Sequence, residues 1–172
     1  MYFCDMEISY LMLGGNVGDR MDYLYQSIDL LRRDAGQIVA MSAIYESEPW
    51  GFDHQQWFLN QVVVVETDLS PLLLLKQIQH IEQTLGRLRE GDGYQPRTMD
   101  IDILLYGNLV INTPELVIPH PRMAGRMFVL QPMAELAPDM EHPVLHRTME
   151  YLREHCMDRK QVREYTCAMS LC

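Results

Sequence analysis

The most constraining feature of the sequence is a short apolar stretch that aspartate interrupts twice. Residues 99–106 read MDIDILLY. Such residues favour a buried strand, in which alternate side chains share one face of the sheet. Asp100 and Asp102 are therefore expected to lie together with Thr98 on one face. The opposite face, which is expected to point into the core, carries Met99, Ile101, Ile103 and Leu105.

The two aspartates are expected about 7 Å apart along this strand. Two like charges on one face repel each other unless a positive group lies between them. Aspartate is also a poor strand former, so its presence twice in an apolar strand indicates function. Carboxylates suit Mg²⁺, which completes its shell with water and phosphate oxygens, and two ions can be held as in two-metal phosphoryl transfer. The alternative is a solvated strand face with incidental aspartates.

Arginines near this strand support a phosphate ligand. The chain carries a formal net charge of −10, so its surface repels nucleic acid and a polyanion needs a local cationic cluster. Arginine forks match phosphate oxygens well. The alternative is that arginine usage reflects genome composition. The cluster within forty residues comprises Arg87, Arg89, Arg97, Arg122 and Arg126.

Hydrophobic periodicity predicts the order strand, helix, strand, strand, helix, strand. The strands are expected at 6–13, 38–47, 58–67 and 99–106; the first helix starts near 23 and ends at 34–36, and the second spans 70–85. A turn at 107–108 leads to a short partner strand at 109–110, and further helices are expected at 126–137 and 144–156. This order predicts an α+β fold: a ferredoxin-like βαββαβ core, with a single layer of antiparallel sheet covered by helices and additional C-terminal helices.

Length and composition predict one domain in the cytoplasm. The 172 residues fit a single domain, expected at 1–158, with 159–172 as a mobile tail. No apolar run reaches the roughly 18 residues that span a bilayer, and the N-terminus does not resemble a secretory signal. Cys4, Cys156, Cys167 and Cys172 form no Cys-x-x-Cys pair, so reduced thiols are expected. We expect a monomer without nucleic-acid or membrane partners.

Two loops offer further candidates. The glycine-rich turn at 14–18 lacks the Lys-Ser or Lys-Thr of a Walker loop, which leaves Asn16 as its one ligand-binding candidate. The aromatic segments at 47–51 and 57–60 suit a planar heterocycle, although core packing is the alternative. His120 lies between two prolines and could contact phosphate or transfer a proton; the alternative is a structural hydrogen bond.

Together these motifs resemble the 6-hydroxymethyl-7,8-dihydropterin pyrophosphokinase family of folate biosynthesis. The resemblance runs from about Tyr10 to Pro138, and residues 96–107 are its most specific part. The supporting segments, in the family's order, are 13–16, 45–49, 58–60 and 118–123.

The resemblance implies a ferredoxin-like fold and transfer of the diphosphoryl unit of ATP to the pterin hydroxymethyl oxygen, with release of AMP. It implies that Asp100 and Asp102 bind two Mg²⁺ ions and that Arg87 and Arg97 are catalytic and contact ATP phosphates. The ATP side would also include Glu82, Ile103, His120 and Arg126. The pterin side would comprise Asn16, Ser47, Glu48, Trp50, Phe58, Asn60, Asp100 and Phe128, with the pterin ring between the two phenylalanines.

Two other functions are compatible with parts of the sequence. One is a different two-metal phosphoryl or nucleotidyl transferase, which would share the Asp-x-Asp strand but lack the pterin pocket. The other is a non-catalytic ferredoxin-like module that binds RNA or a regulatory ligand. The acidic net charge and the lack of a basic, aromatic RNP-like strand disfavour RNA, and a regulatory module does not need paired aspartates.

Overall fold

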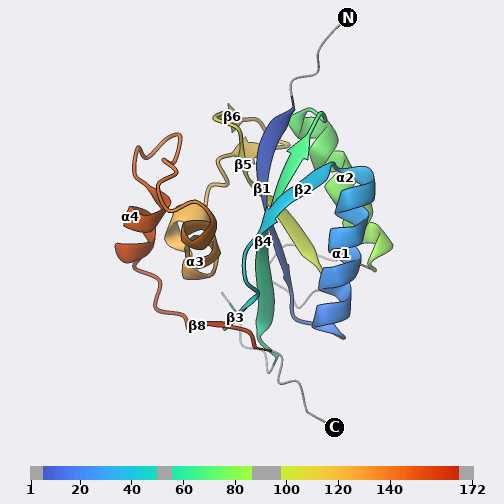
Figure 1. The fold of residues 1–172 in the computed structure, drawn as a ribbon, viewed down its shortest axis with the longest axis horizontal. Helices are drawn as coiled ribbons and strands as arrows, with labels where there is room; N and C mark the ends of the chain where they lie inside the picture. Colours follow the sequence, from blue (N-terminus) through green and yellow to red (C-terminus); the bar gives the residue numbers. More distant parts are fainter. Residues whose placement is uncertain (1–5, 50–55, 87–97, 167–172) are drawn as a thin grey trace, which may run out of the picture.

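An antiparallel sheet lies between two layers of helices (Figure 1). The computed structural model describes residues 6–49, 56–86 and 98–166. One face of the sheet carries α1 (Arg20–Asp34) and α2 (Pro71–Thr84). The other face carries α3 (Met127–Leu136), against which α4 (Met149–Glu154) packs from outside. No helix within these described ranges is long and apolar enough to cross a membrane.

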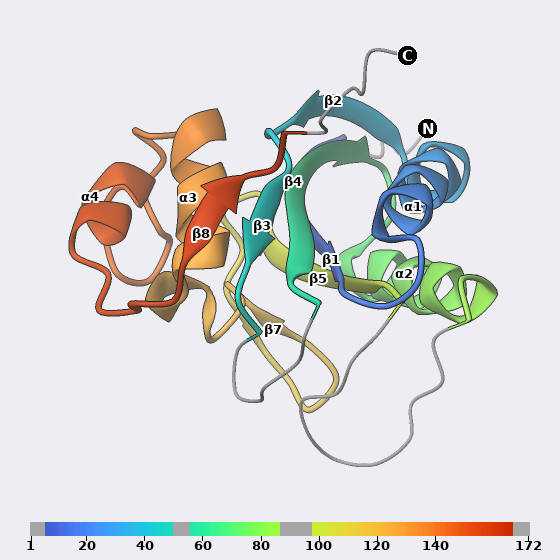
Figure 2. The ribbon, with the colours of Figure 1, turned by 90° about the horizontal axis from the view of Figure 1, so that it is seen from below.

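The sheet has the strand order β5-β1-β4-β3-β8, and β2 also pairs with β4. Every pairing is antiparallel. The two apolar runs at 6–13 and 58–67 form the long central strands β1 and β4, which pair with each other (Figure 2). The strands are β1 (Glu7–Gly15), β2 (Gln37–Met41), β3 (Tyr45–Ser47), β4 (Phe58–Thr67), β5 (Asp100–Tyr106) and β8 (Val162–Glu164).

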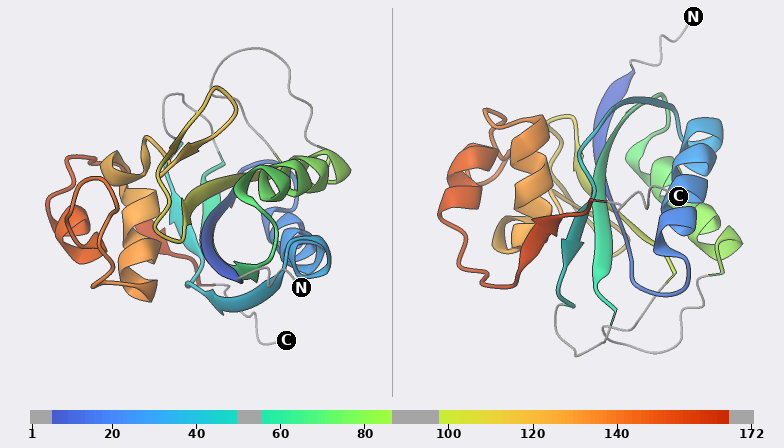
Figure 3. Two further views of the ribbon diagram at one scale, coloured as in Figure 1. Left: turned by 90° about the horizontal axis from the view of Figure 1, so that it is seen from above. Right: turned by 60° about the horizontal axis from the view of Figure 1, so that its bottom comes forward.

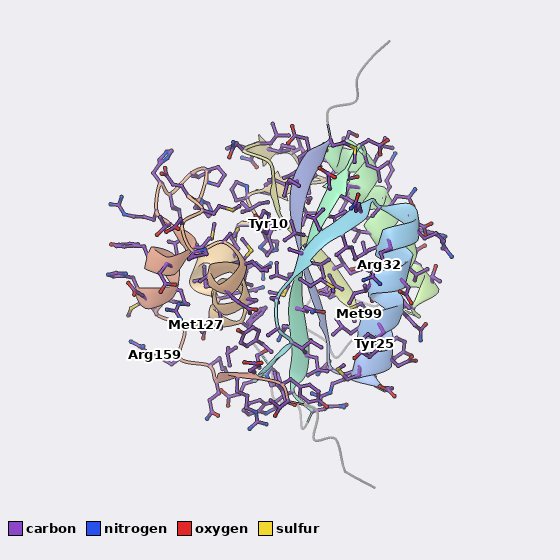
Figure 4. The ribbon with its side chains drawn as sticks, viewed as in Figure 1. Tyr10, Tyr25, Arg32, Met99, Met127 and Arg159 are labelled. Carbon is purple, nitrogen blue, oxygen red and sulfur yellow. The ribbon has the colours of Figure 1, made fainter. Side chains whose placement is uncertain are left out.

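The core is divided by the sheet into two clusters. Leu11 and Leu13 of β1 pack with α1 and α2, whereas Met12 between them packs with α3. Figure 4 shows the same division, with Tyr10 on the α3 side and Met99 on the α1 side. Because both faces are buried, a polar residue on either face needs a local reason.

The helix ends follow the expected signals. Asp19 is the N-cap of α1 and accepts a hydrogen bond from the Asp22 amide at 3.0 Å. Ser70 occupies the N-cap position of α2 with Pro71 next, but the Ser70 side chain makes no capping hydrogen bond. The predicted helix at 126–137 is confirmed as α3.

The strand predicted at 38–47 is interrupted, which corrects the sequence analysis. Met41 lies opposite Val63 and Tyr45 lies opposite Asn60. The chain from Met41 to Tyr45 is therefore one residue longer than the part of β4 that faces it. The break is stabilised by α3, because the Ala43 amide donates to Glu135 at 2.9 Å instead of pairing with β4.

A second irregularity corrects the face predicted for Leu105. The register of β1 and β5 shifts by one residue, so that Tyr10 lies opposite Leu105 and Leu11 lies opposite Ile103. Leu105 therefore packs on the α3 side with Leu104, and not on the side of Ile103. Periodicity alone does not reveal such a bulge.

The short partner strand predicted at 109–110 was also wrong. Leu109 and Val110 are exposed, and the hairpin instead pairs β6 (Ile111–Asn112) with β7 (Val117–Ile118). This hairpin leads into the 3₁₀ helix η1 (Met123–Gly125), which precedes α3.

The C-terminal part differs from expectation in two ways. The helix predicted at 144–156 is shortened to α4, because the imidazole of His142 accepts the amides of Val144 and Leu145 in a turn, and Thr148 caps the helix. The segment expected to be a mobile tail contains β8, which joins the sheet beside β3 (Figure 3).

The turn after α1 generates a stability prediction. Gly36 has φ +147°, and a Cβ there would collide with the carbonyl oxygen of Glu66. Gly36→Ala should therefore destabilise the fold by more than about 2 kcal/mol in urea unfolding. Gly86→Ala is the matched control: its φ is +82° but its surroundings are open, so about 1 kcal/mol is expected. Equal losses in the two variants would contradict the collision.

Candidate functional site

A row of four residues crosses the sheet on the face that carries α3. Asp100 lies opposite Gly14, Gly14 lies opposite Asn60, and Asn60 lies opposite Tyr45. Directly opposed residues of antiparallel strands point to the same face. The row therefore brings together residues that lie far apart in the sequence, at the end of the sheet where β1 ends and β5 begins.

Asp100 and Asp102 share this face, as the strand pattern predicted. Both are partly exposed, whereas Ile101 between them is buried on the opposite face. Asp102 lies opposite Met12, which packs with α3. In the described ranges no group of three or more His, Cys, Asp or Glu side chains could hold a metal. Two carboxylates fit Mg²⁺, whose remaining ligands are commonly water and substrate phosphates.

His120 and Arg126 approach the aspartates from the segment between β7 and α3. The His120 amide donates to the Leu104 carbonyl at 2.9 Å, which attaches this segment to β5. Burial lowers the pKa of His120; the positive charge of Arg126 lowers it further, and Asp100 acts in the opposite direction. His120 therefore lies close enough to both Arg126 and Asp100 to interact with their charges.

The remaining polar residues form a buried wall. Asn60 donates from Nδ2 to Ser47 Oγ at 2.7 Å, and both side chains are only 2% exposed. A Cβ at Gly14 would lie 3.0 Å from Asn60 Oδ1, so the glycine makes room for the amide. Phe58 lies opposite Ser47 on the same face. Amide and hydroxyl groups beside a half-buried aromatic ring can orient a planar polar ligand.

Asn16 and Phe128 complete this region. Asn16 is fully buried after β1, and its Nδ2 donates to the Gln56 carbonyl at 3.3 Å. Phe128 stands in the first turn of α3 and packs against the cluster on that side of the sheet. The Arg126 guanidinium lies 5.6 Å from the centre of the Phe128 ring.

Three further sequence candidates have contacts within the protein. The Ile103 side chain is buried in the core beneath α1 and α2. The Glu82 carboxylate is 2% exposed and accepts the Ile101 amide at 2.8 Å, so it attaches α2 to β5. Glu48 accepts a hydrogen bond from the Gln161 amide at 2.8 Å. Trp50, Arg87 and Arg97 lie outside the described residues.

A comparison with protein families covers these residues. A model of the 7,8-dihydro-6-hydroxymethylpterin-pyrophosphokinase (HPPK) family matches residues 10–138, which include every described residue of the site. The chain belongs to this family.

Similar proteins support the assignment. The chain is 47% identical over 135 residues to a Bacillus subtilis protein named 2-amino-4-hydroxy-6-hydroxymethyldihydropteridine pyrophosphokinase, covering 78% of this chain and 80% of the relative. An Aquifex aeolicus protein of the same name is 41% identical over 145 residues, covering 84% and 89%. Both relatives match along most of their length.

Solved structures show the same fold. The crystal structure of wild-type Plasmodium falciparum HPPK-DHPS with pteroate aligns with a TM-score of 0.73 and 17% identity, covering 87% of this chain. The chain spans 44% of that longer protein, so this likeness concerns the fold.

A charged network of this HPPK-family member was missed by the sequence analysis. Glu46 is held between Arg20, at 2.8 Å, and Arg163, at 2.7 Å. Burial alone would raise the pKa of Glu46, but hydrogen bonds from Arg163 and Arg20 and their charges lower it below its usual value. Arg20 also donates to the Trp57 carbonyl at 2.6 Å, next to Phe58. These partners are too distant in sequence for any local pattern to indicate them.

This network predicts a pH-dependent stability. A lowered carboxyl pKa contributes stability above the usual value of 4.5, and this contribution is lost as pH falls through the lower pKa of the folded protein. Glu46→Gln should therefore cost about 1–3 kcal/mol at neutral pH, measured by urea unfolding. The difference from wild type should shrink below pH 4.5.

Glu150→Gln is the matched control, since Glu150 pairs with Arg153 at the surface and should contribute less than about 1 kcal/mol. A deficit of Glu46→Gln that stayed constant down to acid pH would contradict the charged network.

Proposed function

We propose that the chain transfers the diphosphoryl group of ATP to the hydroxymethyl oxygen of 6-hydroxymethyl-7,8-dihydropterin in folate biosynthesis, releasing AMP. The observation that carries this function is the row across the α3 face. It joins a carboxylate end at Asp100 and Asp102 to an amide and aromatic end at Asn60 and Phe58. One end suits phosphates with metal, and the other suits a planar heterocycle.

We assign the fold to the ferredoxin-like class. The element order through β5 is strand, helix, strand, strand, helix, strand once β2 and β3 are treated as one interrupted strand. The spatial order β5-β1-β4-β3 supports this assignment, because the first and third strands lie at the centre of the antiparallel sheet. The hairpin β6–β7 and the C-terminal helices are additions to it.

Asp100 and Asp102 are proposed to hold two Mg²⁺ ions with ATP. When bound, the metal neutralises phosphate charge and can lower the pKa of the attacking hydroxyl. Arg126 would add a positive charge near the phosphates, and Arg87 and Arg97 are proposed to do the same. Glu82 attaches the edge strand that bears the aspartates and is proposed to lie near the adenosine, as is the backbone of Ile103.

His120 is proposed to contact the phosphates as a neutral donor. Burial and Arg126 lower its pKa, which favours the uncharged ring near pH 7. The Arg122 amide donates to His120 Nδ1 at 3.2 Å, so the proton of the neutral ring resides on Nε2. This leaves Nε2–H as a hydrogen-bond donor for a phosphate oxygen.

The pterin is proposed to lie between Phe58 and Phe128, with its polar edge against Ser47 and Asn60. Asn16, Glu48, Trp50 and Asp100 are proposed to border the same site. The hydroxymethyl oxygen attacks the β-phosphorus of ATP in line as the bond to the AMP oxygen breaks. Positioning and charge neutralisation supply most of the rate, since no described side chain is required as a base.

The molecular setting is also a proposal. We infer a cytoplasmic monomer whose partners are ATP and the pterin. The net charge of −10 and the scattered cysteines support an acidic cytosolic protein that does not bind nucleic acid. Light scattering after size exclusion tests the monomer.

The first functional test measures AMP. Wild-type protein should form AMP from ATP only when both hydroxymethyldihydropterin and Mg²⁺ are present. Asp100→Ala and Asp102→Ala should each lower the rate by more than about 10³-fold, because charge stabilisation at the phosphates is lost. Circular dichroism should show an intact fold in both variants.

Asp29→Ala, a surface carboxylate on α1 that is 77% exposed, is the matched control and should behave as wild type. Near-normal activity of either site variant would refute the metal site. Absence of AMP with wild-type protein would favour a different phosphoryl transferase.

The pterin end has its own test. Asn60→Ala should raise the KM for the pterin by about tenfold or more, the loss expected for a hydrogen bond to a ligand in a buried site, and leave the KM for ATP nearly unchanged. The matched control is Gln61→Ala, the next amide on β4, which donates to the Ser42 carbonyl at 2.7 Å on the opposite face. Equal effects of the two variants on the pterin KM would contradict the proposed pocket.

A further inference from the structure

The C-terminal segment 158–165 runs from the N-terminus of α3 to β3. Figure 2 shows β8 passing from the α3 side to the edge of the sheet at β3. Both α3 and β3 contact β8. The family match ends at Pro138, so this segment lies beyond it.

One end of the segment is attached to α3 by Asp158. Its Oδ2 accepts the amide of Met127, the first residue of α3, at 3.0 Å. Its Oδ1 accepts the Lys160 amide at 3.0 Å, which turns the chain toward β3. A carboxylate at a helix N-terminus is also favoured by the helix dipole. Asp158 thus positions the turn of α3 that carries Arg126 and Phe128.

The other end is attached to β3 by backbone pairing. The Glu48 amide donates to the Gln161 carbonyl at 3.2 Å, and the Gln161 amide donates to Glu48 Oε2 at 2.8 Å. Val162 then lies opposite Ser47. The segment therefore covers the outer edge of the strand that carries Ser47, whose hydroxyl contacts Asn60.

Two side chains of the segment, Arg163 and Tyr165, extend this attachment to Trp57, which precedes β4, and to Arg20, which begins α1. The Arg163 guanidinium bonds Glu46 at 2.7 Å and lies 4.7 Å from the ring centre of Trp57. Arg20 lies 5.7 Å from the ring centre of Tyr165. Trp57 directly precedes Phe58, so the segment also braces the start of the strand that carries this ring.

The two ends of α3 are thus attached differently to the sheet. Near its C-terminus, Glu135 accepts the Tyr45 hydroxyl at 2.8 Å and the Ala43 amide at 2.9 Å. Near its N-terminus, where Phe128 lies, Asp158 provides an attachment through the C-terminal segment. A pterin ring stacked between Phe58 and Phe128 needs the two phenylalanine rings to lie about 7 Å apart, which is twice the contact distance of carbon atoms.

We propose that residues 158–165 act as a strap that sets the separation of the two walls of the pterin site, with Asp158 and Arg163 as positioning residues at its two ends. This inference rests on the proposed pterin pocket. A strap no longer holds the two walls once either end is released. Releasing both ends should therefore reduce pterin affinity no more than releasing one end. Two independent local contacts would instead give additive losses.

The test is a double-mutant cycle on steady-state kinetics with Asp158→Ala, Arg163→Ala and the double variant. Each single variant should raise the KM for hydroxymethyldihydropterin about tenfold, with kcat within about threefold of wild type. The double variant should also raise this KM about tenfold, and not about a hundredfold. Asp158→Asn, which keeps an acceptor for the Met127 amide, should restore most of the affinity.

Arg32→Ala is the matched control, because Arg32 is a surface arginine of α1 on the opposite side of the sheet (Figure 4). Its pterin KM should equal that of wild type.

An unchanged pterin KM in the single variants, or additive losses of affinity in the double variant, would overturn the strap. If Asp158→Ala does not fold, the Arg163 end alone decides: a raised pterin KM in Arg163→Ala supports the strap, and an unchanged pterin KM overturns it. Wild-type protein that forms no AMP would instead refute the proposed function.

Discussion

The close approach of three strands at Gly14 is the constraint on which the site depends. β1 lies between β4 and β5, and Gly14 has Asn60 on one side and Asp100 on the other. Any larger residue would push the Asn60 amide, because a Cβ would already lie 3.0 Å from it. The missing side chain lets a polar row cross a sheet whose two faces are otherwise buried in apolar clusters.

This row places two chemically different sets of side chains on one face of the sheet. At the β5 end, Asp100 and Asp102 are partly exposed, and the charges of Asp100 and Arg126 both act on His120. At the β3 end, Ser47 and Asn60 are buried and hydrogen-bonded, which suits recognition of a rigid polar ring. The distance between the ends is set by strand spacing, so the backbone of the sheet would align the proposed pterin and ATP sites.

Local pattern predicted the elements that carry the site but not the contacts between them. The two aspartates on one face followed from strand periodicity, and α1, α2 and α3 followed from hydrophobic periodicity. The bulge that moves Leu105 to the α3 side and the break between β2 and β3 depend on pairing register, which a single strand does not encode. Likewise, β8 is stabilised by Glu46 and Glu48, more than one hundred residues away in sequence.

The central claim is that Asp100 and Asp102 hold the metal beside the phosphates of ATP, at the carboxylate end of this row. The most direct measurement is a crystal structure with Mn²⁺, a non-hydrolysable ATP analogue and the pterin, recorded with anomalous diffraction. If both residues hold the metal, anomalous peaks should lie about 2 Å from carboxylate oxygens of Asp100 and Asp102, next to the analogue's phosphates. Metal and phosphates bound elsewhere, with both carboxylates uncoordinated, would contradict it.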